Sequence, residues 1–288
     1  MARRTPAAER TVAVLNFLAA NRDRRYSLSD LARELDLNKA TAHALLATLV
    51  DAAFLVRDED EKTYTLGPAV IPLGAAARVA FPAVALAEQP MQEVADELEL
   101  QCVASADIDD HIVILSTSGL RRPIGINIEP GLRIPLLPPL GAVFVAWADE
   151  RRVQRWLDGM GPDATDADRD RQRDVLRVIR ERGYSIGLGG EGNQRMVESL
   201  RVPERRHRRP GAPADDYSVI DLGDTEAYRV SQLGAPVFDQ RGQAAMALFL
   251  FGFDGLVAGR DIPVFAERLL AAAEQVTTAL RGRVPVVT

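Results

Sequence analysis

Short apolar stripes separated by polar breaks run through the first fifty residues of the chain. Their spacing predicts a helix over 9–19, a second over 28–35 and a third that begins after Asn38. Ser27 and Asp30 have the spacing of a capping box for the second helix, and Asn38 is a good N-cap for the third. The positions predicted to face inward are Val12, Leu15, Leu18 and Ala19 in the first helix and Ala42, Leu45, Leu46 and Leu49 in the third.

Two short strand-like segments follow, at 54–57 and 63–66. The polar run 58–62 between them is typical of a hairpin tip. Three short helices closed by a hairpin are the layout of a winged helix-turn-helix, whose last helix enters the major groove of DNA. The sequence therefore predicts a DNA-binding domain over residues 1–67.

The remaining chain alternates helical and strand-like segments. Residues 68–87 are rich in Ala, Val and Leu and predict a linker helix that Pro82 limits or kinks. Further predictions are helices at 88–99, 140–148, 168–182 and 263–280, strands at 101–106, 111–117, 124–128, 230–238 and 243–251, and loops at 187–192 and 193–216. This mixture predicts a second domain of the α+β class over 88–288.

Composition places the chain among globular proteins. It has 288 residues with 47% hydrophobic residues, enough to bury a sizeable core. There is no run of 18 apolar residues and no signal-like N-terminus, so we expect a cytoplasmic protein without a membrane partner. The single cysteine, Cys102, excludes an internal disulfide and is expected to be a small buried side chain.

The distribution of charged residues along the chain bears on DNA binding more than the net charge does. The formal net charge of −6 argues against a DNA partner. Residues 1–66, however, hold ten basic and ten acidic side chains, so this segment is neutral and the rest of the chain carries the deficit. Four of these acids form one run at the predicted wing tip, 58–61, and phosphate would repel them. DNA binding is therefore permitted, with a wing that stays out of the minor groove.

The residues from Leu28 to Leu49, followed by Tyr64-Thr-Leu-Gly67, resemble the IclR family of bacterial transcriptional regulators. Leu140-Gly141, 180–184 and 235–239 continue the resemblance in family order. It implies a winged helix-turn-helix, a linker helix and a C-terminal GAF-like α/β domain for a small organic effector, often an aromatic acid or a central metabolite. It also implies homodimers or dimers of dimers.

Several positions depart from the family pattern. In the recognition helix, Ala40 and Ala44 stand where a hydroxyl and a guanidinium are usual. The acidic pair expected after Tyr184 is replaced by Ser185-Ile-Gly-Leu, and Gln232 stands where a cysteine is common. The expected fold survives these changes, but the family's effectors do not transfer.

Two sets of residues are the binding candidates. The expected contacts to double-stranded DNA are Arg22, Arg24, Arg25, Ser27, Asn38, Lys39, Thr41, Ala42 and His43. The expected effector contacts, carried over by family position, are Arg133, Pro138, Pro139, Leu140, Gly141, Ser231 and Gln232. Purely structural interpretations stay open. The arginines can be solvated surface groups, Asn38 can serve only as a helix cap, and Ser231 and Gln232 can be ordinary strand residues.

Arg133 suits a carboxylate, because a guanidinium binds one bidentately, and the prolines beside it suit an apolar or aromatic effector. No nucleophile and base, metal-ligand cluster or cofactor motif emerges, and the glycines of 187–192 are interpreted as a loop. We therefore expect no enzyme and no cofactor. The leading hypothesis is a ligand-responsive regulator that binds a pseudo-palindromic operator as a dimer, as a repressor or an activator. The alternative is a small-molecule sensor with weakened DNA binding that acts through protein partners.

Overall fold

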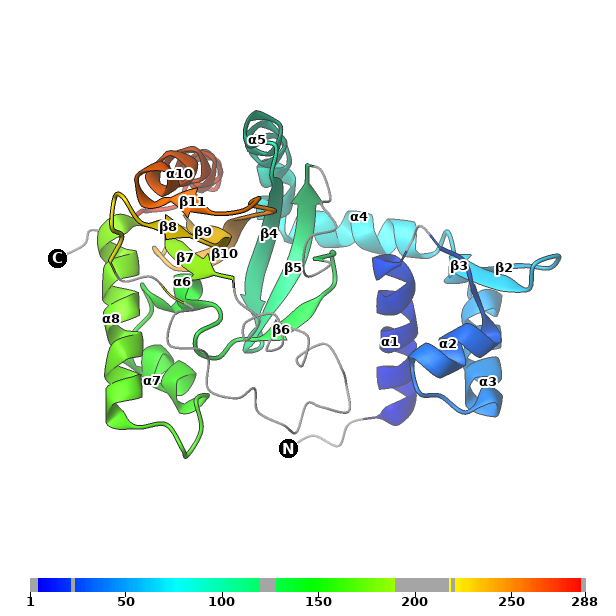
Figure 1. Ribbon diagram of the computed structural model, residues 1–288. Coiled ribbons are helices and arrows are strands. Elements are labelled where there is room, and N and C mark those ends of the chain that lie inside the picture. The colour runs from blue at the N-terminus through cyan, green and yellow to red at the C-terminus, as the bar shows by residue number, and fades with distance from the viewer. Residues whose placement is uncertain (1–4, 22–23, 120–127, 190–217, 219–220, 286–288) are drawn as a thin grey trace. The chain divides into compact units, whose positions relative to one another are not determined.

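The structure is a computed structural model that describes residues 5–21, 24–119, 128–189, 218 and 221–285 (Figure 1). The chain divides into two compact units. One comprises 1–81 with 130–132, and the other comprises 82–129 with 133–288. Each unit has its own apolar core.

The N-terminal unit is built from helices and a small sheet. Its elements are α1 (Pro6–Ala20), β1 (Tyr26–Ser27), α2 (Leu28–Glu34), α3 (Lys39–Asp51), β2 (Leu55–Asp58), β3 (Thr63–Leu66) and α4 (Val70–Ala80). The strands pair antiparallel in the order β1-β3-β2. The predicted three helices and hairpin are confirmed. β1 was missed because two residues are too short to show an alternation.

Both predicted helix caps are present. The backbone N–H of Asp30 donates to Ser27 Oγ, and Ser27 N–H donates back to the Asp30 carboxylate, which completes the capping box of α2. At α3, Thr41 N–H donates to Asn38 Oδ1 over 2.8 Å. These caps satisfy backbone donors that an N-terminal turn leaves without helical partners.

The buried face of α1 agrees with the predicted one at Leu18, which is buried, and at Leu15, which is partly buried against the core, but not elsewhere. Val14 and Leu18 are buried, whereas Val12 is 54% exposed and Ala19 is exposed. Phe17 packs edge-on against Tyr26 with ring centroids 4.8 Å apart, which turns the stripe 14, 17 and 18 inward. In α3, the predicted inward positions are confirmed, with Ala42, Leu46 and Leu49 buried and Leu45 partly buried against the core.

The C-terminal unit is a six-stranded antiparallel sheet covered by helices. Its elements are α5 (Pro82–Leu98), β4 (Gln101–Ile108), β5 (His111–Ser118), β6 (Arg133–Pro135), α6 (Ala142–Val145), α7 (Glu150–Asp158), α8 (Asp166–Arg182), β7 (Ser185–Leu188), β8 (Ala227–Tyr228), β9 (Val230–Phe238), β10 (Ala244–Phe251), β11 (Val257–Ala258), a 3-10 turn at Gly259–Asp261, and α10 (Ile262–Ala279). The sheet order is β6-β5-β4-β10-β9-β7, and β8 pairs with β11 apart from it.

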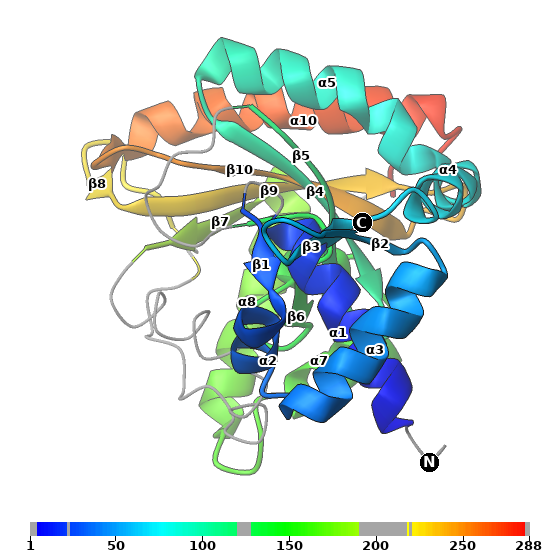
Figure 2. The same ribbon diagram turned by 90° about the vertical axis from the view of Figure 1, so that its right-hand side faces the viewer.

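The helices lie on both faces of this sheet. Figure 2 shows α5 and α10 side by side on one face, and α6 and α8 pack together beyond the other (Figure 1). Strand alternation sorts the side chains between the faces. On β10, Leu248 and Leu250 join the core under α5 and α10, whereas Phe249 lies within 6.5 Å of Phe144 of α6, measured between ring centroids. The face of the sheet toward α6 and α8 therefore packs through a different set of strand side chains than the face toward α5 and α10.

Several elements of this unit differ from their predictions. The helix boundary expected at 87/88 falls at Phe81, because Pro82 has no N–H to continue a helix. Residues 187–192 were predicted as a loop, but 187 and 188 belong to β7, which forms by pairing with β9. In the expected helix 140–148 only Ala142–Val145 is α-helical, and the helix α7 was missed.

Two predicted segments fall mainly on undescribed residues. Of the strand expected at 124–128, only Ile128 is described, and it is not in a strand. The loop expected at 193–216 lies outside the described residues. Within the described part of the chain, no single helix is long and apolar enough to span a membrane. Only α4 and α5 taken together, bent by 90° at their junction, pass on length and composition.

Candidate DNA-binding helix and effector pocket

The outer face of α3 carries few polar groups. Lys39 and His43 are exposed and lie one turn apart, so they share a side of the helix. Ala40, Ala44, Ala47 and Thr48 are also exposed near them, and the Thr48 hydroxyl donates to the Ala44 carbonyl oxygen within the helix. Lys39 and His43 therefore supply most of the polar chemistry that this face can offer to DNA.

Three other predicted DNA contacts have structural roles in α2 and α3. Ala42 is only 1% exposed and packs into the core, so it is not available to DNA, and its prediction as a contact is corrected. The Ser27 hydroxyl and the Asn38 side-chain oxygen both cap helices. Thr41 is half-buried at the first turn of α3.

The predicted cationic contacts separate into two kinds. Arg25 Nη1 lies 2.7 Å from Asp58 and 3.4 Å from Glu61, so carboxylates of the wing neutralise it. Arg24 lies over the Tyr26 ring at 5.1 Å from its centroid. Lys39 forms no ion pair with any residue that the structure describes. Arg22 lies outside the described residues. Lys39 is thus the better placed cation for a phosphate.

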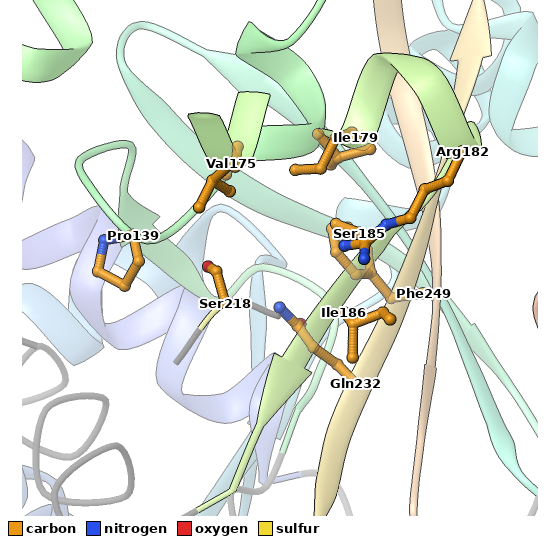
Figure 3. Close-up of a pocket in the computed structure, with 12 residues that line it drawn as sticks. Pro139, Val175, Ile179, Arg182, Ser185, Ile186, Ser218, Gln232 and Phe249 are labelled. Atoms are coloured by element: carbon orange, nitrogen blue, oxygen red, sulfur yellow. The ribbon is translucent and has the colours of Figure 1, made fainter. Parts of the chain in front are cut away.

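A pocket opens in the C-terminal unit between α8 and the sheet. Val175, Ile179 and Arg182 line it from successive turns of α8 (Figure 3). This spacing follows from the amphipathic pattern of a capped helix whose inward stripe is apolar. The strand side contributes Ser185, Ile186, Gln232 and Phe249, and the remaining lining residues are Pro139, Gly141, Ala142, Val143 and Ser218.

Two glycines shape the pocket region. A Cβ at Gly234 would lie 2.5 Å from the Phe249 ring and 2.7 Å from Ser185 Oγ, so only glycine lets these two side chains meet there. Gly141 has φ of +75°, which favours glycine, and a Cβ there would lie 2.0 Å from Leu136 Cδ1. Gly234 thus leaves room for two residues that line the pocket, and Gly141 leaves room for Leu136 beside it.

Arg182 is the cation of this pocket. Its Nε donates to the Tyr184 carbonyl oxygen at 2.6 Å, and its guanidinium carbon lies 5.1 Å from the centroid of the Tyr184 ring. Burial lowers the pKa of Arg182 to about 10, because a low-dielectric surrounding disfavours the charged form. The side chain still carries its charge at neutral pH.

The sequence predicted part of this lining. Of the expected effector residues, Pro139, Gly141 and Gln232 line the pocket, and Arg133, Pro138, Leu140 and Ser231 do not. Arg133 is exposed on β6, and the Leu140 carbonyl accepts a hydrogen bond from the Trp156 indole at 2.9 Å. Arg182 was missed, although its place at the end of an amphipathic helix before Gly183 marks it as a residue near the sheet.

The described residues offer no catalytic or metal chemistry. They contain no cluster of three or more His, Cys, Asp or Glu side chains that could hold a metal ion. Cys102 is fully buried, and burial raises the pKa of its thiol to about 12, so the thiolate nucleophile is suppressed. His111 Nδ1 lies 2.7 Å from the carbonyl oxygen of Asp109 in the adjoining turn.

Sequence comparison identifies the N-terminal unit. Residues 7–59 match the IclR helix-turn-helix domain. The glycerol operon regulatory protein of Streptomyces coelicolor is 42% identical over 74 residues, which cover 26% of this chain and 29% of that protein. The chain thus matches less than a third of that relative's length.

Comparison with solved structures extends over the whole fold. The IclR transcriptional regulator of Alicyclobacillus acidocaldarius is 22% identical with a TM-score of 0.63, over 96% of this chain and 100% of that one. An IclR homologue of Microbacterium hydrocarbonoxydans, solved with 4-hydroxybenzoate, is 18% identical with a TM-score of 0.63, over 96% and 99%. These similarities concern the fold, and they agree with the predicted GAF-like C-terminal domain.

A DNA-binding helix-turn-helix followed by an α/β unit defines a class of transcriptional regulator. Residues 7–59 form an IclR helix-turn-helix domain, as the sequence motifs predicted, and the chain as a whole has the fold of IclR regulators. Its relatives are regulators and not enzymes, which agrees with the expectation for this chain.

Proposed function

We propose that the protein is a ligand-responsive regulator that binds a pseudo-palindromic operator as a homodimer, in the cytoplasm where the DNA lies. The observation that carries this proposal is the capped helix α3, with Lys39 and His43 exposed on an IclR helix-turn-helix domain. Lys39 contacts a backbone phosphate, and His43 reaches a phosphate or a guanine acceptor in the major groove.

The homodimer is supported by α4. No side chain of α4 is buried, yet the helix is apolar, with Ile71 70%, Leu73 56% and Val79 83% exposed. Large apolar side chains exposed together on one helix mark a protein–protein interface. In our proposal, α4 of a second copy covers this apolar stripe, which pairs two α3 helices for two operator half-sites about one DNA turn apart.

Substitutions in α4 test the dimer separately. Ile71→Asp and Val79→Asp place charges on the stripe and should shift the purified protein from dimer to monomer in sedimentation experiments. Val264→Asp is a matched control, since Val264 is 57% exposed in the other unit. A dimer that survives both α4 substitutions would remove α4 from the interface.

The pocket beneath α8 is the proposed effector site. It combines apolar side chains with a few polar groups, as small-molecule sites do. The Microbacterium homologue was solved with 4-hydroxybenzoate, which shows that this fold accommodates a small organic molecule in a related protein. Effector binding then alters operator affinity, and linkage requires the operator to alter effector affinity by the same factor.

Selection of DNA tests the proposed function directly. The purified full chain is incubated with a random duplex pool at several salt concentrations, and the bound DNA is sequenced. We expect a two-fold repeat to be enriched, with affinity falling steeply as salt rises. If no repeat is enriched even at low salt, the operator-binding proposal fails.

A second candidate is a sensor that acts through protein partners with weakened DNA binding. It is favoured by the alanines at 40, 44 and 47 on the exposed face of α3 and by the acidic wing tip. The same selection separates the two: retained effector binding without any enriched DNA supports the sensor.

A further inference from the structure

The exposed face of α3 (Figure 1) carries two parallel rows of side chains. Lys39 and His43 are four residues apart and form one row. Ala40, Ala44 and Ala47 are spaced by four and three residues and form the second, which we call the alanine row. Residues at these spacings lie on one side of a helix, and all five side chains are exposed. The surface beside the two polar side chains is therefore made of methyl groups.

Few hydrogen-bonding groups lie beside the alanine row. As a whole, α3 contains no arginine, asparagine or glutamine, the side chains that pair with guanine or adenine through two hydrogen bonds. The Thr48 hydroxyl donates to the Ala44 carbonyl oxygen at 2.9 Å, and the Asn38 side-chain oxygen caps the helix. On the exposed face, hydrogen bonds to bases therefore come mainly from Lys39 and His43.

The wing contributes little to sequence recognition. It carries four acids at 58–61, which phosphate repels. Arg57 Nη1 of the wing lies 3.4 Å from the Glu59 carboxylate. Arg25 Nη1, from the segment before β1, lies 2.7 Å from the Asp58 carboxylate. Discrimination between bases therefore falls to α3, the helix that a helix-turn-helix places in the major groove.

The alanine row matches one feature of the major groove. Base edges there present hydrogen-bond donors and acceptors, and thymine adds an apolar 5-methyl group. An alanine methyl gains apolar contact with that group, whereas it offers a polar base edge no partner in exchange for lost water. Alanine also ends at Cβ, so no longer side chain keeps the α3 backbone away from base edges along this row. The row therefore favours thymine.

We propose that the alanine row recognises thymine, and that each operator half-site carries thymines whose 5-methyl groups contact Ala40 and Ala44, with Ala47 extending the contact. Ala40 and Ala44 are the specificity-determining pair, because the N-terminal part of a recognition helix meets the base edges. Lys39 and His43 flank the row and bind the polar groups of the DNA beside it. This inference deepens the proposed operator binding and rests on it.

Removal of the thymine methyl tests the recognised base. The repeat selected with the full chain is synthesised with deoxyuridine in place of each conserved thymine in turn, which removes the methyl and keeps the base pair. Affinity is measured by fluorescence anisotropy. At least one position per half-site should lose about two- to fivefold in affinity, and the symmetric pair about the product of the two. Thymines outside the repeat are the control and should be insensitive. A repeat without a conserved thymine, or no effect of uracil at any position, would overturn the proposal.

Glycine variants test the residues. Ala44→Gly and Ala40→Gly remove the protein methyl, and Ala13→Gly is the matched control, since Ala13 is an exposed alanine inside α1 of the same unit. All three lose helix propensity, so the decisive quantity is the ratio of affinities for thymine and uracil DNA. This ratio should fall towards one in at least one α3 variant and stay unchanged in Ala13→Gly. A uracil effect on DNA shape would act equally on all variants. Equal ratios in the native chain and both α3 variants would remove the alanines from the contact.

The same measurements separate this inference from the proposed function. An enriched repeat whose affinity is insensitive to uracil refutes the alanine row and leaves operator binding standing. If no repeat is enriched at low salt, operator binding itself fails and the inference fails with it. An enriched repeat with a uracil effect that an α3 variant abolishes supports both.

Discussion

Lys39 and Arg182 show two uses of a positive charge in one chain. Lys39 stands exposed at the start of α3, where solvent and salt screen it, whereas Arg182 is desolvated at the end of α8. An exposed cation suits a polyanion that brings many phosphates. The affinity for DNA should therefore fall steeply as salt rises.

The largest effect is expected from the core of the N-terminal unit. Leu46 is 1% exposed, and Leu46→Ala should destabilise that unit by about 2–5 kcal/mol, because it removes buried surface and leaves a cavity. DNA binding should be lost and effector binding kept, as measured by thermal unfolding and calorimetry. Val56→Ala is the control, since Val56 is 48% exposed. Parallel loss of both ligands would show that the two units do not act separately.

The converse experiment perturbs the pocket. Gly141→Ala places a Cβ where φ is +75° and where Leu136 lies within 2.0 Å, so we expect a cost of about 1–3 kcal/mol to the C-terminal unit. Effector binding should weaken while DNA enrichment persists. Gly255 has φ of +68° with open space around its Cβ position, so Gly255→Ala separates backbone strain from the clash. Equal effects of the two substitutions would mean that the Leu136 contact is unimportant.

Each of the two units contains a helix that begins with a capping box. Ser27 with Asp30 begins α2, and Thr165 with Asp168 begins α8. Ser27→Ala and Thr165→Ala should each cost about 1 kcal/mol in denaturant unfolding. Ser27→Ala should affect the DNA-binding unit alone, and Thr165→Ala the pocket unit alone. The opposite assignment would contradict the two-unit division.

These boxes also predict a pH dependence. Hydrogen bonds from Ser27 hold the pKa of Asp30 below its usual value, and those from Thr165 do the same for Asp168. A lowered carboxyl pKa adds stability that is present above the unfolded-state value, about 3.9, and is lost as pH falls through the folded-state value. The stability difference between the native chain and each cap variant should therefore shrink below about pH 4, leaving the part that the neutral hydroxyl cap contributes. Differences that persist unchanged at lower pH would exclude the carboxylates as the cause.

The smallest effect is expected on DNA affinity, when substitutions of two cations in the N-terminal unit are compared. Lys39→Ala should weaken binding to all sequences several-fold and reduce the slope of log affinity against log salt by about one. Arg25→Ala should change the slope less, because Asp58 and Glu61 already neutralise Arg25. A larger slope change for Arg25→Ala than for Lys39→Ala would reverse the assignment of the phosphate contact.

Local signals explain which parts of the fold the sequence predicted. The caps at Ser27 and Asn38, the inward stripe of α3 and the stop at Gly183 depend on residues a few positions apart, and all were predicted correctly. The inward face of α1 was predicted correctly only at Leu15 and Leu18, because the contact between Phe17 and Tyr26 also sets this face. β7 has glycine at position 187 and no clear alternation, and its pairing with β9 makes it a strand.

The pocket was harder to predict for the same reason. Its walls come from Pro139, α8, β7, β9 and Phe249, which meet only after the sheet order is set. Chemistry that suits a carboxylate was assigned to Arg133 from family position, but β6 is an edge strand and carries Arg133 at the surface. The arginine beside the pocket is Arg182.

The most direct test of the account measures both ligands together. The affinity of the full chain for its selected DNA repeat is determined with and without a saturating small molecule that binds in the pocket, and the affinity for that molecule is determined with and without the DNA. We predict that both affinities change by the same factor, since linkage makes the coupling reciprocal. A DNA affinity that stays the same with the pocket saturated would contradict regulation by this pocket.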